Sequence, residues 1–204
     1  MDPTSAHEAS RPPIDAHVHD VVDLATGSVV STPGSAAPTA SERASRLQRR
    51  GFPIDLLGTP SHRLSPKYPY QASPEGYLDA YAGDWSAGND QIWWRLPATF
   101  DNDHPTVNAI FSGVAAGARV LTLDVEVWPY AGRTGTIVVF VGDTQAQIPV
   151  SSPTARTIDV SFTHDSSDPF TAMVELRQGV YDFVVHEVTL RSPGIVVTQQ
   201  PPRA

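Results

Sequence analysis

Apolar and polar residues alternate along much of the chain after residue 76, and such alternation is typical of half-buried strands. The clearest case is 119–128. Its apolar positions are Leu121, Leu123, Val125 and Val127, and its polar positions are Thr122, Asp124 and Glu126. Because successive side chains on a strand point to opposite faces, the pattern predicts an antiparallel strand with one buried face and one solvated face.

Similar patterns predict further strands. These are 14–24, 92–100, 107–111, 136–141, 145–150, 157–163, 171–177 and 181–191. The run 136–141 is apolar on both faces and is therefore expected to be a central strand. Turns are predicted at Gly142-Asp143 and, as a hairpin, at Gln178-Gly179, with a bulge near His186-Glu187. This spacing indicates an all-β fold, an antiparallel two-sheet β-sandwich or jelly roll.

The first 75 residues differ from the rest because they hold 10 of the 19 prolines. Proline disfavours long helices and central strands, so 1–75 is interpreted as an extended Pro-rich arm. One short helix is predicted at 39–50: Thr39 and Glu42 have the spacing of a capping box, and Gly51 follows as a C-cap. The expected division is the arm 1–75, a β-sandwich domain 76–192 and a tail 193–204.

Composition removes several classes of function. The formal net charge is -8 and the chain shows no basic block, which disfavours nucleic-acid binding. The absence of cysteine excludes disulfides and thiolate metal sites. No apolar run approaches the length of a membrane span, and the first residues do not read as a signal peptide, so membrane insertion is not expected. An extracellular or virion-associated location is the expectation.

The segment Ile14-Asp15-Ala16-His17-Val18-His19 resembles the metal-binding strand of the amidohydrolase superfamily. Residues i and i+2 of a strand share a face, so His17 and His19 are candidate ligands of one metal ion. That superfamily has a (β/α)₈ barrel, for which this chain is too short and lacks alternating helices. A metal-dependent hydrolase is therefore kept as a remote alternative to an arm strand that is solvated or contacts a subunit.

Acidic turns are candidate calcium sites, because carboxylate and carbonyl oxygens suit this cation. The first is Asp101-Asn102-Asp103-His104, in which Asp101 and Asp103 are candidate ligands, and another is Asp165-Ser166-Ser167-Asp168. Asp, Asn and Ser are also ordinary turn formers, and none of these segments matches an EF-hand. No cofactor is expected apart from such a structural calcium.

Aromatic residues gather around the first predicted strands of the domain and beside a strand end. The predicted ligand-binding residues are Tyr81, Asp84, Trp85, Asn89, Trp94, Trp128 and Tyr130. Flat rings can stack on the CH groups of sugars while carboxylates and amides bind the hydroxyls. The alternative is that these rings plug the ends of the sandwich or the docking site of the arm.

From Asp84 to Arg191 the chain resembles galactose-binding-like jelly rolls, the fold of many carbohydrate-binding modules. The strand spacing and the closing run from Gly179 to Leu190 carry this resemblance. It implies a fold, which does not by itself give a function. The first functional hypothesis is a non-catalytic module that binds a glycan or another surface ligand through aromatic and acidic rim loops. No Gly-x-Ser-x-Gly motif is present, and no enzyme is predicted. The alternative is a structural subunit of an oligomer or larger assembly, such as a phage virion or a secretion-type particle, laced together by the arm.

Overall fold

The computed structural model describes residues 12–14, 16–34, 62–64, 76–81, 84–88, 91–95, 106–165, 170–177 and 180–191. Their strands are β1 (His17–Asp23), β2 (Ser28–Gly34), β3 (His62–Leu64), β4 (Gly76–Tyr81), β5 (Asp84–Gly88), β6 (Gln91–Arg95), β7 (Thr106–Phe111), β8 (Gly117–Pro129), β9 (Gly135–Val141), β10 (Thr144–Val150), β11 (Thr154–His164), β12 (Phe170–Arg177) and β13 (Val180–Arg191). These residues include no helix long and apolar enough to cross a membrane. The predicted helix 39–50 and tail 193–204 lie outside the described residues.

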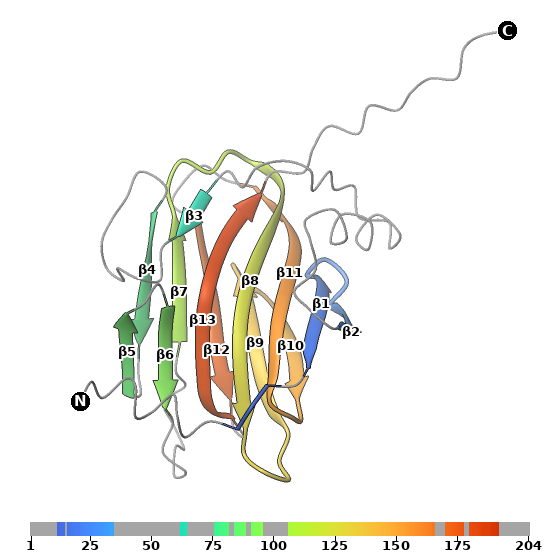
Figure 1. Ribbon diagram of the computed structural model, residues 1–204. Coiled ribbons are helices and arrows are strands. Elements are labelled where there is room, and N and C mark those ends of the chain that lie inside the picture. Colours follow the sequence, from blue (N-terminus) through green and yellow to red (C-terminus); the bar gives the residue numbers. More distant parts are fainter. Residues whose placement is uncertain are drawn as a thin grey trace, which may run out of the picture.

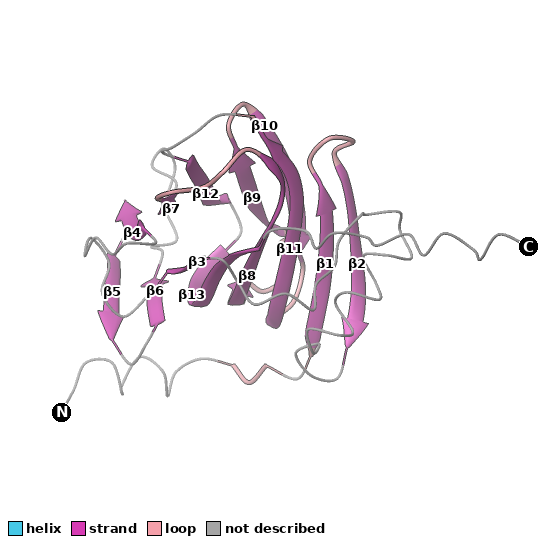
Figure 2. Ribbon diagram, turned by 90° about the horizontal axis from the view of Figure 1, so that it is seen from above, coloured by secondary structure: helices cyan, strands magenta, loops and turns pink. Residues whose placement is uncertain are grey.

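The strands form two sheets that pack face to face (Figures 1 and 2). Sheet A has the order β2-β1-β11-β8-β13-β6-β5, and β3 also pairs with β13; sheet B has the order β10-β9-β12-β7-β4. The described pairs are antiparallel except β1 with β11, which is parallel. The all-β, two-sheet sandwich predicted from the sequence is therefore confirmed.

The core lies between the sheets and is built from the apolar positions that the alternation predicted. On β8, Leu121, Leu123, Val125 and Val127 are all buried, and Ile158 and Val160 of β11 join them. Sheet B supplies Ala172, Val174 and Leu176 from β12. Burying each large apolar side chain contributes about 1.5–3 kcal/mol, so these facing rows are the main force holding the sheets together.

Several local predictions can be compared with the sheets. β9 lies between β10 and β12, as expected for a central strand, and residues 142–143 form the turn to β10. The bulge is confirmed by a register shift between Val185 and Glu187. The hairpin at Gln178-Gly179 is wrong, because β12 belongs to sheet B and β13 to sheet A. The chain changes sheets at this point, which a turn dipeptide alone cannot reveal.

The described parts of the predicted arm belong to the sandwich. β1 and β2 extend sheet A beyond β11, and β3 pairs with β13, so the expected boundary at residue 75 does not divide the sheet. Before β1, the Trp128 indole N–H donates to the Pro12 carbonyl over 3.0 Å. Ile14 packs against Trp128 and Val184. This segment therefore contacts its own domain, and lacing between subunits stays a prediction.

Candidate ligand-binding site

A pocket of about 510 Å³ lies at the end of the sandwich that is uppermost in Figure 1, where the β9–β10 turn meets the end of β11 and the start of β12. We call it the rim pocket. Its lining residues are Val141, Gly142, Asp143, Thr144, Thr163, His164, Asp165, Phe170 and Thr171. Three hydroxyls, two carboxylates and an imidazole therefore surround a space that can admit a small ligand.

Local sequence explains how this wall forms. Val141 pairs with Thr144, so Gly142 and Asp143 make a two-residue turn. Gly142 has a φ of 57°, a left-handed conformation that glycine adopts without steric cost. On the opposite side, His164 pairs with Gly117 at the last position of the β8–β11 ladder. The pocket thus lies where one strand of sheet A ends beside a tight hairpin of sheet B.

His164 is the most informative residue of the rim pocket. It is only 7% exposed, and its Nε2 is a buried atom without a hydrogen-bond partner among the described residues. Buried polar atoms nearly always have partners, and an unsatisfied one calls for an explanation such as a ligand or water. A neutral imidazole offers one donor and one acceptor, so His164 is equipped to bind a polar ligand group.

Phe170 forms the apolar part of the wall. Its ring stacks on Phe162 at a centroid distance of 5.0 Å and on Phe111 at 5.6 Å. The His164 ring meets it edge-on at 5.0 Å. Because the Phe170 ring is already stacked within the core, recognition in this pocket relies on hydrogen bonding and charge more than on ring stacking.

A second group of polar residues covers the outer face of sheet A, opposite the core. His19 Nε2 lies 2.7 Å from Asp159 Oδ2, and the Thr122 hydroxyl donates to Asp159 Oδ1 over 2.6 Å. Since a carboxylate only accepts, the His19 Nε2–H is the donor. All three side chains are buried. This part of the face is therefore a closed hydrogen-bonded network rather than an open catalytic site.

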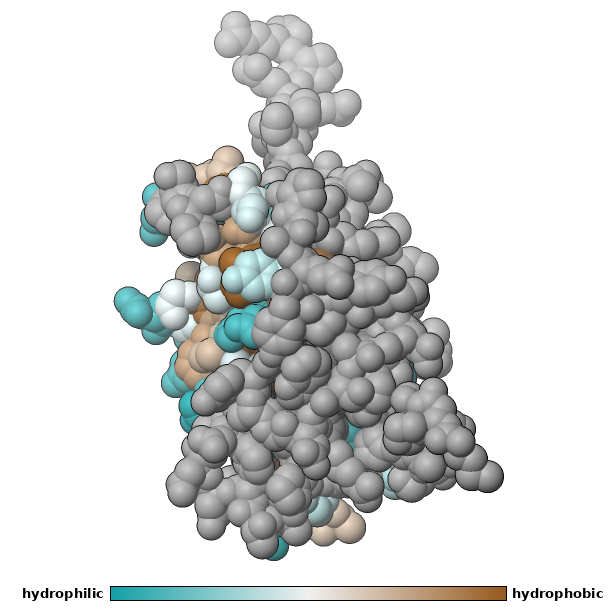
Figure 3. Space-filling model, turned by 90° about the vertical axis from the view of Figure 1, so that its left-hand side faces the viewer, coloured by the Kyte–Doolittle hydropathy of each residue, from teal (hydrophilic) through white to brown (hydrophobic). Residues whose placement is uncertain are grey.

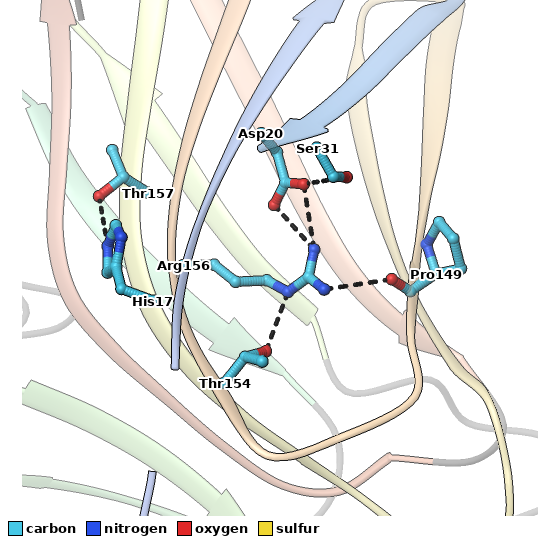
Figure 4. Close-up of polar contacts among 7 residues, drawn as sticks. All are labelled: His17, Asp20, Ser31, Pro149, Thr154, Arg156 and Thr157. Carbon is cyan, nitrogen blue, oxygen red and sulfur yellow. Dashed lines mark hydrogen bonds and ion pairs between the residues drawn. The ribbon is translucent and has the colours of Figure 1, made fainter. Parts of the chain in front are cut away.

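The same face holds a second chain of hydrogen bonds. The Thr157 hydroxyl donates to Asp124 over 2.6 Å and accepts from His17 Nε2 over 3.2 Å, a contact drawn in Figure 4. Farther along β8, Glu126 lies 3.2 Å from His186 Nε2, with side chains 32% and 40% exposed. The outer face is thus buried around Asp159 and Thr122 and more accessible around Glu126 and His186. We call these residues together the outer polar face.

A third polar cluster lies on the other face of β11, within the sandwich (Figure 4). Both Asp20 carboxylate oxygens accept from Arg156 Nη1, at 3.1 and 2.9 Å, and Asp20 also accepts from the Ser31 hydroxyl. The Arg156 guanidinium donates further to the Thr154 hydroxyl and to the Pro149 carbonyl of β10. This arginine cluster ties the β1–β2 hairpin to both sheets.

The predicted metal ligands lie partly inside and partly outside the described residues. Within the described ranges, no group of three or more His, Asp or Glu side chains is arranged to hold a metal ion. His17 and His19 do share a face of β1, and each is hydrogen-bonded to β11, through Thr157 and Asp159 respectively. Asp101 and Asp103 lie outside the described residues, and a calcium ion there stays a prediction.

The structure brings several predicted ligand-binding residues to the opposite end of sheet A. Asp84, Arg95, Asp182 and Trp128 stand in one row across four strands. The next row contains Trp85, Trp94, Phe183 and Val127. Phe183 and Val127 are fully buried core residues. Trp85 of β5 and Trp94 of β6 are therefore neighbours in the strand ladder.

The remaining predicted ligand residues are scattered. Trp128 is 2% exposed and covered by the segment of Pro12 and Ile14, so it presents no open ring for stacking. Tyr130 follows β8 in a turn closed by a hydrogen bond from the Arg133 N–H to the Tyr130 carbonyl. Tyr81 ends β4, in sheet B, and Asn89 lies outside the described residues. Seen from the side of β4 and β5, the described surface mixes hydrophilic and hydrophobic residues (Figure 3).

Sequence reasoning did not find the rim pocket. Of its two acids, Asp143 lies in a segment that is predicted only as a turn, and Asp165 begins an acidic turn that is a candidate calcium site. His164 is not among the predicted site residues, because a single histidine at the end of an alternating strand carries no distinctive signal. Phe170 of the pocket wall pairs with Phe111, and their strands, β12 and β7, are far apart in the sequence although they are neighbours in the sheet.

No known protein-family model matches the chain, and no curated protein matches it. Solved structures similar to it include BtGH115A, a GH115 4-O-methyl-alpha-glucuronidase with specificity for decorated arabinogalactans (8% identity, TM-score 0.42, covering 67% of this chain and 18% of that one). Another is the CBM36-1 domain of a multidomain xylanase from the hindgut metagenome of Trinervitermes trinervoides (14%, 0.38, 57% and 91%). A third is the C-terminal CBM6 of LamC, a marine laminarinase from Zobellia galactanivorans (9%, 0.37, 64% and 98%).

Carbohydrate-binding modules with a β-sandwich fold are thus among the structures to which the chain is similar, as the sequence resemblance indicated. The chain spans less than a fifth of BtGH115A and 22% of PfGH50B, another similar structure. At TM-scores below 0.5 these similarities carry no argument about function. The two sheets themselves show the fold, and the rim pocket is the candidate site for ligand binding.

Proposed function

We propose that the protein is a non-catalytic glycan-binding module whose ligand site is the rim pocket. The observation that carries this proposal is the combination of His164 Nε2, buried and without a partner among the described residues, with the hydroxyls and carboxylates lining the same pocket. A polyhydroxylated ligand offers many donors and acceptors to such a wall. The β-sandwich supplies a rigid frame, because four strands, β9, β10, β11 and β12, from both sheets hold the lining residues.

The first experiment is a glycan-array screen of the full chain, followed by calorimetric titration of the best ligand. The decisive variant is Thr171→Tyr, which fills the pocket from an exposed position on β12. We expect it to weaken binding at least tenfold, about 1.4 kcal/mol. Gln147→Tyr is the matched control, because Gln147 is an exposed residue of β10 that does not line the pocket. It should bind like the unmodified protein.

The alternative location is the aromatic end of the sandwich that the sequence predicted. Tyr130→Ala tests it, because Tyr130 is partly exposed in the turn after β8, at the end opposite the rim pocket. If the rim pocket is the site, Tyr130→Ala leaves the affinity unchanged. A large loss in Tyr130→Ala with normal binding in Thr171→Tyr would contradict our assignment and favour the predicted surface.

The non-catalytic part of the proposal has its own test. The best glycan is incubated with a high concentration of the protein, and the products are separated by chromatography. We expect the glycan to stay intact. Shorter sugars that appear with this protein, and are absent with Thr171→Tyr, would show that the pocket is a hydrolytic site and would overturn this part. Failure of every glycan on the array to bind would overturn the proposal itself.

A further inference from the structure

The charges around the rim pocket have one sign. Among its lining residues, Asp143 and Asp165 carry carboxylates, and no lysine or arginine is included. Both acids are exposed, one on the β9–β10 turn and one directly after β11, so they approach the pocket from the two sheets. Both carboxylates would attract a positively charged group of a ligand and would repel a carboxylate of a ligand.

The hydrogen-bonding groups point in the same direction. His164 is more than nine-tenths buried, and Nε2 has no partner among the described residues. When this nitrogen is the unprotonated one of a neutral ring, it accepts a hydrogen bond. The two exposed carboxylates present acceptors to the pocket, and the buried imidazole nitrogen supplies one more to a donor that reaches it, which suits a ligand group rich in N–H donors. The hydroxyls of Thr144, Thr163 and Thr171 can complete recognition of sugar hydroxyls.

From this acceptor-rich, acidic lining we propose that the pocket selects a glycan bearing a free amine, that is, an amino sugar whose ammonium group lies between Asp143 and Asp165. This inference rests on the proposed function. An ammonium offers three N–H donors and no acceptor, which complements the described lining. An N-acetylated sugar lacks the charge, and a uronic acid carries the opposite one. A neutral sugar can donate hydroxyl hydrogen bonds to the two carboxylates, but it gains no attraction between opposite charges.

The test compares three oligosaccharides of equal length and linkage. One carries a single amino-sugar unit at its end, the second carries the N-acetylated unit and the third is neutral throughout. A single amine is used because the chain has a net charge of -8 and would attract a polycation without specificity. Titrations are made at about pH 7, where an aliphatic amine is protonated and carboxylates are ionised.

We expect the amine-bearing ligand to bind at least tenfold more tightly than the other two. Asp143→Asn and Asp165→Asn should each remove most of this preference while leaving affinity for the neutral ligand within about twofold. Asp79→Asn makes the same change in net charge on β4, at the far edge of sheet B, and should keep the preference. Thr171→Tyr should abolish binding of all three ligands.

The outcomes separate this inference from the proposed function. Equal affinity for the three ligands, lost in Thr171→Tyr, would leave a glycan module standing and overturn the amine selectivity. Equal loss of preference in Asp79→Asn and Asp143→Asn would show general charge attraction and also overturn it. Binding that a calcium chelator abolishes would assign the carboxylates to a cation instead of an amine. Absence of binding by every ligand would sink both proposals.

Discussion

β11 carries two buried polar clusters, one on each face, and they differ in what satisfies them. On the core side, the Arg156 guanidinium donates to the Asp20 carboxylate, the Thr154 hydroxyl and the Pro149 carbonyl. On the outer side, Thr157 passes a hydrogen bond from His17 to Asp124, and Asp159 accepts from His19 and Thr122. The core side therefore buries a full ion pair, whereas the outer side distributes its carboxylates among hydroxyl and imidazole donors.

This difference shows that alternation along a strand distinguishes its two faces but does not indicate which face is exposed to solvent. The outer positions of β8 were predicted to be solvated, yet Thr122 is buried and Asp124 partly so. A buried charge is costly unless it is paired and hydrogen-bonded. Each cluster therefore commits its strand to one set of partners, and the energetic penalty for removing one partner should differ between the two faces.

The largest effect is expected for Arg156→Met. It leaves the fully buried Asp20 carboxylate with the Ser31 hydroxyl as its remaining partner among the contacts described, so we expect a loss of about 3–5 kcal/mol in the free energy of unfolding. Urea titration followed by fluorescence measures it. The double variant Asp20→Leu/Arg156→Met should recover much of the loss, because an apolar pair removes the uncompensated charge. A double variant no more stable than Arg156→Met would contradict this explanation.

A smaller effect is expected on the outer face for Thr157→Val. The substitution keeps the side-chain shape and removes the hydroxyl that joins His17 to Asp124, so it should cost about 1–3 kcal/mol by the same titration. Thr163→Val is the control, since Thr163 is an exposed position of the same strand. A loss as large as that of Arg156→Met would erase the proposed difference between the two faces.

The smallest effect is expected where the outer polar face is accessible, at Glu126 and His186. His186→Gln removes the contact between His186 Nε2 and the Glu126 carboxylate. The two side chains are 40% and 32% exposed, so solvent screens the interaction. We expect a change below about 1 kcal/mol, and weaker still at high salt. If this variant destabilised the protein as much as Thr157→Val, the gradient from buried to accessible across the outer face would not describe the energetics.

Part of the fold could be read in advance because its signals are local. The alternation of β8 and β11, the apolar run of β9 and the two-residue turn at Gly142-Asp143 all specify a strand or turn within a few residues. The pairing of strands is a different matter. Gln178-Gly179 reads like a hairpin turn, yet β12 and β13 belong to different sheets. Turn chemistry permits both outcomes, and the packing of the sheets selects between them.

The candidate site shows the same limit. Asp165 is predicted in an acidic turn directly after His164, but no local pattern in the sequence connects these two residues with Asp143. The aromatic residues chosen from the sequence were grouped by proximity along the chain. In the structure, Trp128 lies under Pro12 and Ile14. Composition marks a residue as suited to binding, and only burial shows whether it is accessible.

The sequence by itself determined the all-β class, most of the strands and the inward faces of β8, β11 and β12, because the alternation of a strand lies in neighbouring residues. It did not predict β2, β3, β4 or β5. Tertiary structure decided which polar groups meet. Asp20 and Arg156 are 136 residues apart, and His19 and Asp159 are 140 residues apart. Such contacts arise when β1 pairs with β11 in parallel, a register that no local pattern specifies. The rim pocket arises in the same way, where the ends of strands from two sheets meet.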